Sequence, residues 1–416
     1  MLVFYSLALL LVLVAGAPYW LFRMAASGKY REGLSERLGF VPRRLRLAEQ
    51  VIWVHAVSVG EVLAASRLIE ELGERSGCRV MISTTTRTGQ LLARERFGAD
   101  RVFYFPLDFA FAIRAYLRAL RPRMVVLMET EFWPRMLVEC RRAGVPIAVV
   151  NARISDRSWP RYLRLRFLWR RLLNGFALVL AQSDMDAERL TALGASNVCA
   201  SGNLKYDIRV AQPATVTEIL RAHLPIGAKV VVCGSTVADE EELLVRLLPL
   251  DVITILAPRH PERFSAVAAM LTDRGVKFVR RSEWLASPSP LSAGMFFLLD
   301  SIGELASAYC LASVAVVGGG MLAPGGHNPL EPAQFGVAVV MGPHYENFRG
   351  IVEKLRAENA IVVARVSALP EVLRDLLSDE ESSRAMGARA RAVFEREAGA
   401  TARAVTALVA VLQERA

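Results

Sequence analysis

The sequence predicts an α/β protein with two doubly wound domains, each built on a parallel sheet, behind an apolar N-terminal helix. The chain has 416 residues, which exceeds the ~150 residues of a typical domain enough to suggest two. Short β-branched runs alternate with longer amphipathic stretches, as in βαβ units, and the alternation occurs twice. A hydrophobic content of 53% and a mean hydropathy of +0.31 fit buried strands together with a membrane segment.

The apolar N-terminal stretch is uncharged from Met1 to Phe22, about the ~20 residues that cross a bilayer as a helix. We interpret residues 1–22 as an uncleaved anchor, because Pro18 follows the small-residue cleavage candidate and no basic residue precedes the apolar run. The basic residues that follow Arg23 place the rest of the chain on the cytoplasmic side. A helix lying in the membrane interface is the alternative, since polar residues and a proline weaken the span.

Candidate strands divide the remaining chain into two halves. In the first half they cover residues 51–57, 79–83, 102–105, 124–128, 146–150 and 177–181. In the second half they cover residues 229–233, 251–256, 276–279, 295–299, 313–317 and 337–341. We expect an N-terminal domain of residues 23–210 and a C-terminal domain of residues 211–416, joined by the polar segment 201–225. The charged helical tail is a candidate to pack back on the first domain.

Tandem doubly wound domains bind ligands at the carboxyl ends of their strands, so the active site is expected in the cleft between them. Glu61 follows the first strand and opens a helix. Its spacing from Ser58 is also that of a capping box, so a structural role is equally open. A carboxylate at a helix N-terminus is kept ionised by the helix dipole, which a general base requires.

Two further acids, Glu129 and Glu131, follow another strand. Thr130 is a candidate cap for the next helix, with Glu131 beside the helix dipole. Glu129 lies nearest the strand end and is the better candidate for the site.

A glycine-rich loop in the second half contains Gly318–Gly320 and Gly325–Gly326. Glycines let the backbone approach a phosphate, and the N-terminus of the helix that follows attracts its charge. Asn328 and Glu331 have cap spacing, with Pro329 suited to the first helical position. The pattern matches neither a P-loop nor the dinucleotide fingerprint.

Arg259 follows another strand of the second half and suits a phosphate group. We interpret the adjacent His260, which lies between prolines, as structural. Asp184 and Asp186 have the spacing of a metal-binding pair, but we favour Ser183 and Asp184 as caps of the following helix.

The net charge of +10 implies anionic surroundings, although no nucleic-acid-binding motif accompanies the basic residues. Five cysteines, odd in number and widely spaced, suggest neither a zinc site nor a disulfide framework. Basic residues gather after the apolar segment and on one predicted helix, at Arg23, Lys29, Arg31, Arg37, Arg43, Arg44 and Arg46 and at Arg157, Arg161, Arg164, Arg166, Arg170 and Arg171.

Across these motifs the chain resembles the 3-deoxy-D-manno-octulosonic acid (Kdo) transferases of lipopolysaccharide synthesis. The resemblance extends over nearly the whole chain, the apolar N-terminus included. The matching motifs are HAVSVGE (55–61), METEFWP (128–134), NARIS (151–155), GNLKYD (202–207), GST (234–236), APRHPERF (257–264), GEL (303–305), GGHNPLEP (325–332) and MGPHYENF (341–348).

This resemblance implies an inverting GT-B glycosyltransferase that needs no metal or cofactor and moves Kdo from CMP-Kdo to a lipid A precursor, lipid IVA. Glu61 matches the catalytic base, and Glu129 and Lys205 match residues assigned to transition-state stabilisation. The implied CMP contacts are Pro258, Arg259, Ile302, Gly303, Glu304, Asn328, Pro329, Leu330 and Glu331.

The same resemblance implies catalytic domains on the cytoplasmic face of a bacterial inner membrane. The anchor and the basic clusters then serve together to hold the protein against an anionic surface. One alternative keeps the fold but makes the chain a membrane-tethered nucleotide-sugar epimerase or hydrolase. Another is a nucleotide-sugar-binding subunit without catalytic activity.

Overall fold

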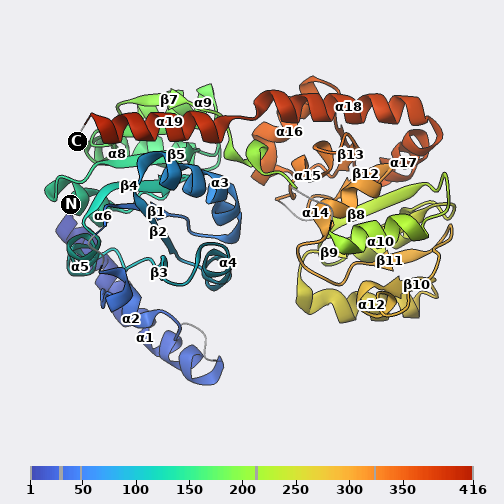
Figure 1. The fold of residues 1–416 in the computed structure, drawn as a ribbon, viewed down its shortest axis with the longest axis horizontal. Coiled ribbons are helices and arrows are strands. Elements are labelled where there is room, and N and C mark those ends of the chain that lie inside the picture. Colours follow the sequence, from blue (N-terminus) through green and yellow to red (C-terminus); the bar gives the residue numbers. More distant parts are fainter. Residues whose placement is uncertain (1, 28–30, 47–48, 211–213, 323–324, 415–416) are drawn as a thin grey trace. The chain divides into compact units, whose positions relative to one another are not determined.

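The computed structural model describes residues 2–27, 31–46, 49–210, 214–322 and 325–414. They form two compact units (Figure 1). Unit 1 combines Met1–Ile208 with Ala398–Ala416, and unit 2 is Arg209–Glu397. The expected C-terminal domain of residues 211–416 therefore ends earlier, because its last helix belongs to unit 1.

Unit 1 is built on a seven-stranded sheet in the order β3-β2-β1-β4-β5-β6-β7, with all neighbours parallel. Its strands are β1 Val51–His55, β2 Arg79–Thr84, β3 Val102–Tyr104, β4 Pro122–Met128, β5 Ile147–Ala152, β6 Leu178–Ala181 and β7 Val198–Ala200. The order reverses between β1 and β4, which is the position where doubly wound folds bind their ligands. The edge strand β7 was not predicted.

Helices cover both faces of this sheet. They are α1 Leu2–Ser27, α2 Leu34–Arg37, η1 Arg43–Leu45, α3 Val59–Ser76, α4 Arg87–Phe97, α5 Ala110–Leu120, α6 Pro134–Arg142, α7 Trp159–Arg164, α8 Arg166–Leu173, α9 Asp184–Ala192, η2 Leu204–Asp207 and α19 Ala400–Gln413. One apolar core packs α5, α6 and α8 against the sheet, and a second packs α3, α4 and α19.

The C-terminal helix α19 lies along α3 in Figure 1 and buries Ala404, Val405 and Leu408 completely. Asp207 fixes the start of α19, because its carboxylate accepts hydrogen bonds from the backbone N–H groups of Gly399 and Thr401, both at 2.6 Å. Segment 201–225, which was expected to be a linker, thus contains η2, and Asp207 of η2 fixes α19 in place.

Unit 2 repeats the architecture with a seven-stranded parallel sheet in the order β10-β11-β9-β8-β12-β13-β14. Its strands are β8 Val230–Thr236, β9 Ile253–Pro258, β10 Phe278–Arg280, β11 Phe296–Leu298, β12 Val314–Val317, β13 Ala338–Met341 and β14 Val362–Val363. Its helices are α10 Thr215–His223, α11 Glu240–Leu247, η3 Pro261–Arg263, α12 Phe264–Asp273, α13 Arg281–Trp284, α14 Leu305–Ala308, η4 Tyr309–Leu311, α15 Leu330–Ala333, η5 Glu346–Phe348, α16 Arg349–Ala357, η6 Val366–Ala368, α17 Leu369–Ser378 and α18 Glu380–Glu397.

Candidate functional site

Glu61 lies in the first turn of α3, directly after the loop that follows β1. Its Oε2 accepts a hydrogen bond from the Val57 backbone N–H at 2.8 Å, and its Oε1 accepts one from the Ser58 hydroxyl at 3.0 Å. Ser58 is the N-cap residue, but its side chain accepts no cap hydrogen bond. The expected capping box is therefore not formed, and the Ser58 hydroxyl instead fixes the orientation of the carboxylate.

Burial makes Glu61 an unusually weak acid for a glutamate. The side chain is only 9% exposed, and this burial raises its pKa from 4.5 to about 7. The charges of Glu129 and Glu131 raise the pKa further, whereas the two hydrogen bonds oppose the shift. With this pKa the carboxylate is about half ionised at neutral pH, although it lies at the N-terminus of a helix. A pKa close to the working pH nevertheless suits a general base.

We expect Glu61→Gln to stabilise the protein relative to wild type at pH 8 but not at pH 5. The raised pKa means that the native state binds more protons than the unfolded state between pH 4.5 and about 7, so native stability falls as pH rises through this window. Above it, the buried charge costs on the order of 3 kcal/mol, a cost that glutamine avoids. Urea unfolding at both pH values measures the difference. Glu70→Gln on the exposed face of α3 is the control, and an equal effect of Glu61→Gln at both pH values would contradict the assignment.

Glu129 and Lys205 lie close to Glu61 in unit 1. Burial lowers the pKa of the Lys205 ammonium, while the nearby charges of Glu129 and Glu61 act in the opposite direction and Arg153 adds to the lowering. Glu129 follows β4 with a left-handed φ of 54°, a strained conformation for a residue with a side chain. The structure thus brings together the three side chains that the sequence assigned to catalysis.

Asn151 orients η2, the short helix that contains Lys205, a role that was not predicted. Asn151 forms a bulge at the end of β5 with φ of 61° and is fully buried. Its Oδ1 accepts a hydrogen bond from the Leu204 backbone N–H at 3.1 Å, at the start of η2. The only signal for this role was its place in the 151–155 motif. The expected cap at Thr130 is wrong, because its hydroxyl donates to the Arg153 carbonyl and α6 begins later, at Pro134.

In unit 2, Asn328 and Glu331 form a polar group near Arg259, which directly follows β9. Asn328 Oδ1 accepts a hydrogen bond from the Leu330 backbone N–H at 3.1 Å, and Asn328 Nδ2 donates to Glu331 Oε1 at 3.4 Å. Burial raises the pKa of Glu331, and the Asn328 hydrogen bond and the charge of Arg259 oppose this shift. Pro258 and Leu330 are buried beneath this group, and Pro329 precedes α15. Arg259 itself is exposed, as a guanidinium that binds an anionic ligand must be.

The glycine-rich loop serves a buried carboxylate that the sequence analysis missed. Glu240, the first residue of α11, is completely buried. It accepts hydrogen bonds from the backbone N–H groups of Gly319 at 2.7 Å, Met321 at 2.9 Å and Val237 at 3.2 Å. The Gly319 amide, one of those expected to approach a phosphate, is thereby occupied. A Cβ atom on Gly318 would lie 2.7 Å from the Thr236 Cα atom, so close packing explains that glycine.

The turn formed by Ile302, Gly303 and Glu304 connects β11 to α14. Ile302 is 66% exposed, Gly303 has a left-handed φ of 89°, and Glu304 accepts a hydrogen bond from Arg281 Nη2 at 2.6 Å. Among the described residues, this turn shares no hydrogen bond with Arg259, Asn328 or Glu331.

Of the two remaining polar motifs, Asp184–Asp186 has a local structural role and His260 has none. Ser183 caps α9 as expected, but Asp186 rather than Asp184 shares that cap. The Asp186 carboxylate accepts hydrogen bonds from the Ser183 hydroxyl at 2.6 Å and the Ile154 backbone N–H at 2.9 Å. His260 is exposed, with its Nδ1 4.0 Å from Glu262 Oε1, so it is not the structural histidine that was expected.

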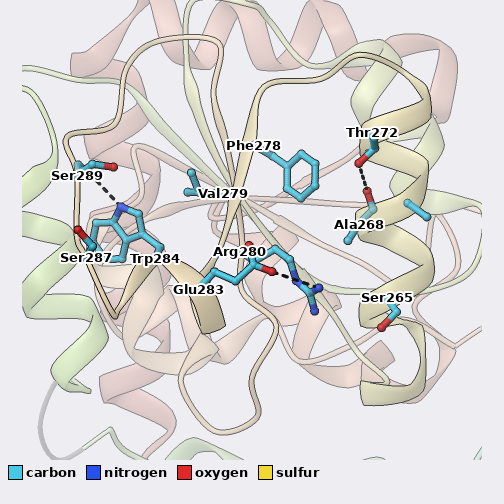
Figure 2. Close-up of a pocket in the computed structure, with 11 residues that line it drawn as sticks. Ser265, Ala268, Thr272, Phe278, Val279, Arg280, Glu283, Trp284, Ser287 and Ser289 are labelled. Atoms are coloured by element: carbon cyan, nitrogen blue, oxygen red, sulfur yellow. Dashed lines mark hydrogen bonds and ion pairs between the residues drawn. The ribbon is translucent and has the colours of Figure 1, made fainter.

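A surface pocket of unit 2 lies between α12, β10 and α13 and contains none of the predicted site residues (Figure 2). Its polar side chains are engaged locally. Arg280 pairs with Asp300 and Glu283, and the Trp284 indole donates a hydrogen bond to the Ser289 carbonyl at 3.0 Å. The pocket is therefore a weaker ligand-site candidate than the Arg259 group.

Comparisons with known proteins agree with the sequence resemblance. The model of a family described as 3-deoxy-D-manno-octulosonic-acid transferase (kdotransferase) matches residues 32–208. A 3-deoxy-D-manno-octulosonic acid transferase of Bordetella pertussis is 35% identical over 94% of this chain and 94% of its own length. The transferase of the same name from Haemophilus influenzae is 32% identical over 93% of each chain.

Solved structures support the fold. A calicheamicin glycosyltransferase covers 88% of this chain and 99% of its own at a TM-score of 0.53 and 14% identity. An identity this low carries the fold alone. The two parallel sheets and this likeness together establish the GT-B fold that was predicted.

Proposed function

Because the chain belongs to the 3-deoxy-D-manno-octulosonic acid transferases, we propose that it moves Kdo from CMP-Kdo to a sugar hydroxyl of a lipid A precursor. The observation that carries the proposal is the group formed by Glu61, Glu129 and Lys205 in unit 1. It combines a carboxylate of pKa about 7, which suits a general base, with an ammonium group largely shielded from solvent, which suits stabilisation of developing negative charge.

In the proposed reaction, Glu61 accepts the proton of the acceptor hydroxyl as the hydroxyl oxygen attacks the anomeric carbon of Kdo. The new bond joins this oxygen to the anomeric carbon. The bond between the anomeric carbon and the phosphate oxygen breaks, and CMP leaves with the electron pair. Attack opposite the leaving group inverts the anomeric configuration. Lys205 and Glu129 stabilise the charges that develop in this transition state.

We assign donor binding to unit 2. Arg259 suits the single phosphate of CMP, and Asn328, Pro329, Leu330 and Glu331 form the polar turn beside it. The exposed Ile302–Glu304 turn offers further contacts for the nucleoside. A monophosphate donor needs fewer cationic groups than a pyrophosphate donor, in keeping with a single arginine after β9.

We also propose that α1 attaches the enzyme to the cytoplasmic face of a bacterial inner membrane. Its residues 2–26 are long and apolar enough to cross a bilayer, with a mean hydropathy of 2.1, and none of the most apolar window is buried in the protein. Attachment would bring the protein to an acceptor that itself resides in the membrane.

Wild-type protein, incubated with CMP-Kdo and a tetraacylated lipid A precursor, is expected to increase the acceptor mass by whole Kdo residues. Mass spectrometry of the extracted lipid detects the product, and release of CMP measures donor use. CMP release without a glycolipid product would reject transfer and support hydrolysis. Turnover of a UDP-sugar without any acceptor would instead support the epimerase alternative.

A further inference from the structure

The helix α1 is fastened to unit 1 at its first turn. Arg135 Nε donates a hydrogen bond to the Ser6 hydroxyl at 3.0 Å, and Arg135 Nη2 donates to the Leu2 carbonyl at 3.3 Å. The Tyr5 hydroxyl hydrogen-bonds to the buried carboxylate of Asp108. Asp108 also accepts hydrogen bonds from two backbone N–H groups at the start of α6, so this attachment point is itself rigidly held.

The chain is fastened to unit 1 again soon after α1 ends at Ser27. Glu36 in α2 accepts a hydrogen bond from the Tyr104 backbone N–H at 2.7 Å, and the Tyr116 hydroxyl donates to the Glu36 carbonyl at 3.1 Å. The first turn of α1 and the segment that follows its last turn therefore both contact the same globular unit.

This double attachment is incompatible with a helix that crosses the bilayer. The 26 residues of α1 extend about 39 Å, and the hydrocarbon core of a bilayer is roughly 30 Å thick. A crossing helix would place its first turn on the far side of the membrane from unit 1. All the contacts that Leu2, Tyr5 and Ser6 make with α6 and Asp108 would then be broken.

The exposure of the α1 side chains agrees with attachment of the helix to unit 1 at both ends. The half-buried side chains of α1 include Leu2, Tyr5, Leu9 and Leu13, whose spacing places them on one face of the helix. The opposite face consists of side chains that are 55–77% exposed, namely Val3, Phe4, Leu7, Leu11 and Val14. An interfacial helix usually needs a polar face toward water. In α1, the contacts of Leu2, Tyr5 and Ser6 with Arg135 and Asp108 hold the first turn against unit 1 in place of such a polar face.

We infer that α1 is a monotopic anchor that lies in the plane of the membrane, between unit 1 and the acyl chains, with its first turn on the cytoplasmic side. This inference rests on the proposed membrane attachment and adds its geometry. The partner of the exposed apolar face is the bilayer hydrocarbon. Exposed Arg31, Arg43 and Arg46, which follow in the chain, suit the anionic head groups beside it.

Protease protection of the full chain, carrying short uncharged N-terminal and C-terminal epitope tags, tests the topology. In spheroplasts, protease added outside is expected to leave both tags intact. In inverted inner-membrane vesicles, both tags are expected to be removed together. Removal of the N-terminal tag alone in spheroplasts would show a crossing helix and overturn the inference. Recovery of the chain in the soluble fraction would instead overturn membrane attachment itself, without affecting the transfer assay in detergent.

A photoreactive residue placed at Leu9 or at Phe4 gives a second measurement that needs no tag. We expect Leu9, on the covered face, to cross-link to peptides of unit 1, and Phe4, which is 77% exposed, to cross-link to lipid. Phe4 is the matched control, since it lies five residues away on the opposite face of the same helix. Cross-linking of both positions to lipid alone would contradict the in-plane arrangement. Cross-linking of Phe4 to a second copy would replace the lipid with a protein partner.

Discussion

Glu61→Ala is expected to lower kcat/KM for Kdo transfer by about 10²- to 10⁴-fold, the usual contribution of a positioned general base. The loss should fall mainly on kcat, because the donor site assigned to unit 2 does not contain this residue. Wild-type kcat/KM should fall about tenfold per pH unit below pH 7, since only the deprotonated carboxylate accepts the proton and its pKa is about 7. Initial rates of Kdo addition between pH 5.5 and 8.5 measure both effects.

The matched control for this experiment is Glu70→Ala, which removes an exposed carboxylate from the same helix and should leave the rate within twofold. CMP binding by calorimetry separates chemistry from donor affinity and should be equal in wild type and Glu61→Ala. More than a tenth of wild-type activity in Glu61→Ala, or a flat pH profile, would remove Glu61 from the role of base.

The second large effect is expected for Glu240→Ala, on stability as well as on donor binding. The substitution leaves two buried amides and the part-buried Val237 amide without their acceptor, and each buried one costs about 1–3 kcal/mol. A loss of several kcal/mol should appear as a lower urea midpoint for unit 2. The loop from Gly318 to Met321 would also lose its attachment to α11, and CMP affinity should fall with it.

Glu242→Ala is the control on the same helix, because it removes only a surface pair with Arg274. Pairs of this kind contribute about 0–1 kcal/mol, so the urea midpoint should change little. If Glu240→Ala unfolded at the same urea concentration as Glu242→Ala, the three hydrogen bonds would have no stabilising role.

The sequence predicted all ten inner strands of the two sheets, together with the edge strands β3 and β10, because buried parallel strands are continuous apolar and β-branched runs. It missed β7 and β14, which lie at the sheet edges and have three and two residues. Their side chains are exposed or only half-buried, so they lack the buried apolar run that marks the equally short β3 and β11. Their assignment depends on the neighbouring strand to which they bond.

Within the site, residues directly after strands were predictable because topology places those loops together. The role of Glu240 could not be predicted, because three successive glutamates (Glu240–Glu242) are typical of a solvent-exposed first turn of a helix. Only the loop from Gly318 to Met321, some 80 positions later in the chain, makes its first glutamate a buried acceptor. Asn151 escaped for the same reason, since its partner Leu204 is distant in sequence. The pKa of Glu61 likewise depends on burial, which spacing does not reveal.

The return of α19 to unit 1 has a consequence for biosynthesis. Unit 1 is discontinuous, and one of its two cores includes side chains from residues 400–412, which the ribosome adds only after the whole of unit 2. Unit 2 is continuous, so all its residues emerge before α19 does. During translation the nascent chain therefore exposes the apolar face of α3 until all of unit 2 has been synthesised. Loss of α19 alone would leave that face permanently uncovered, which makes this helix a vulnerable point for aggregation.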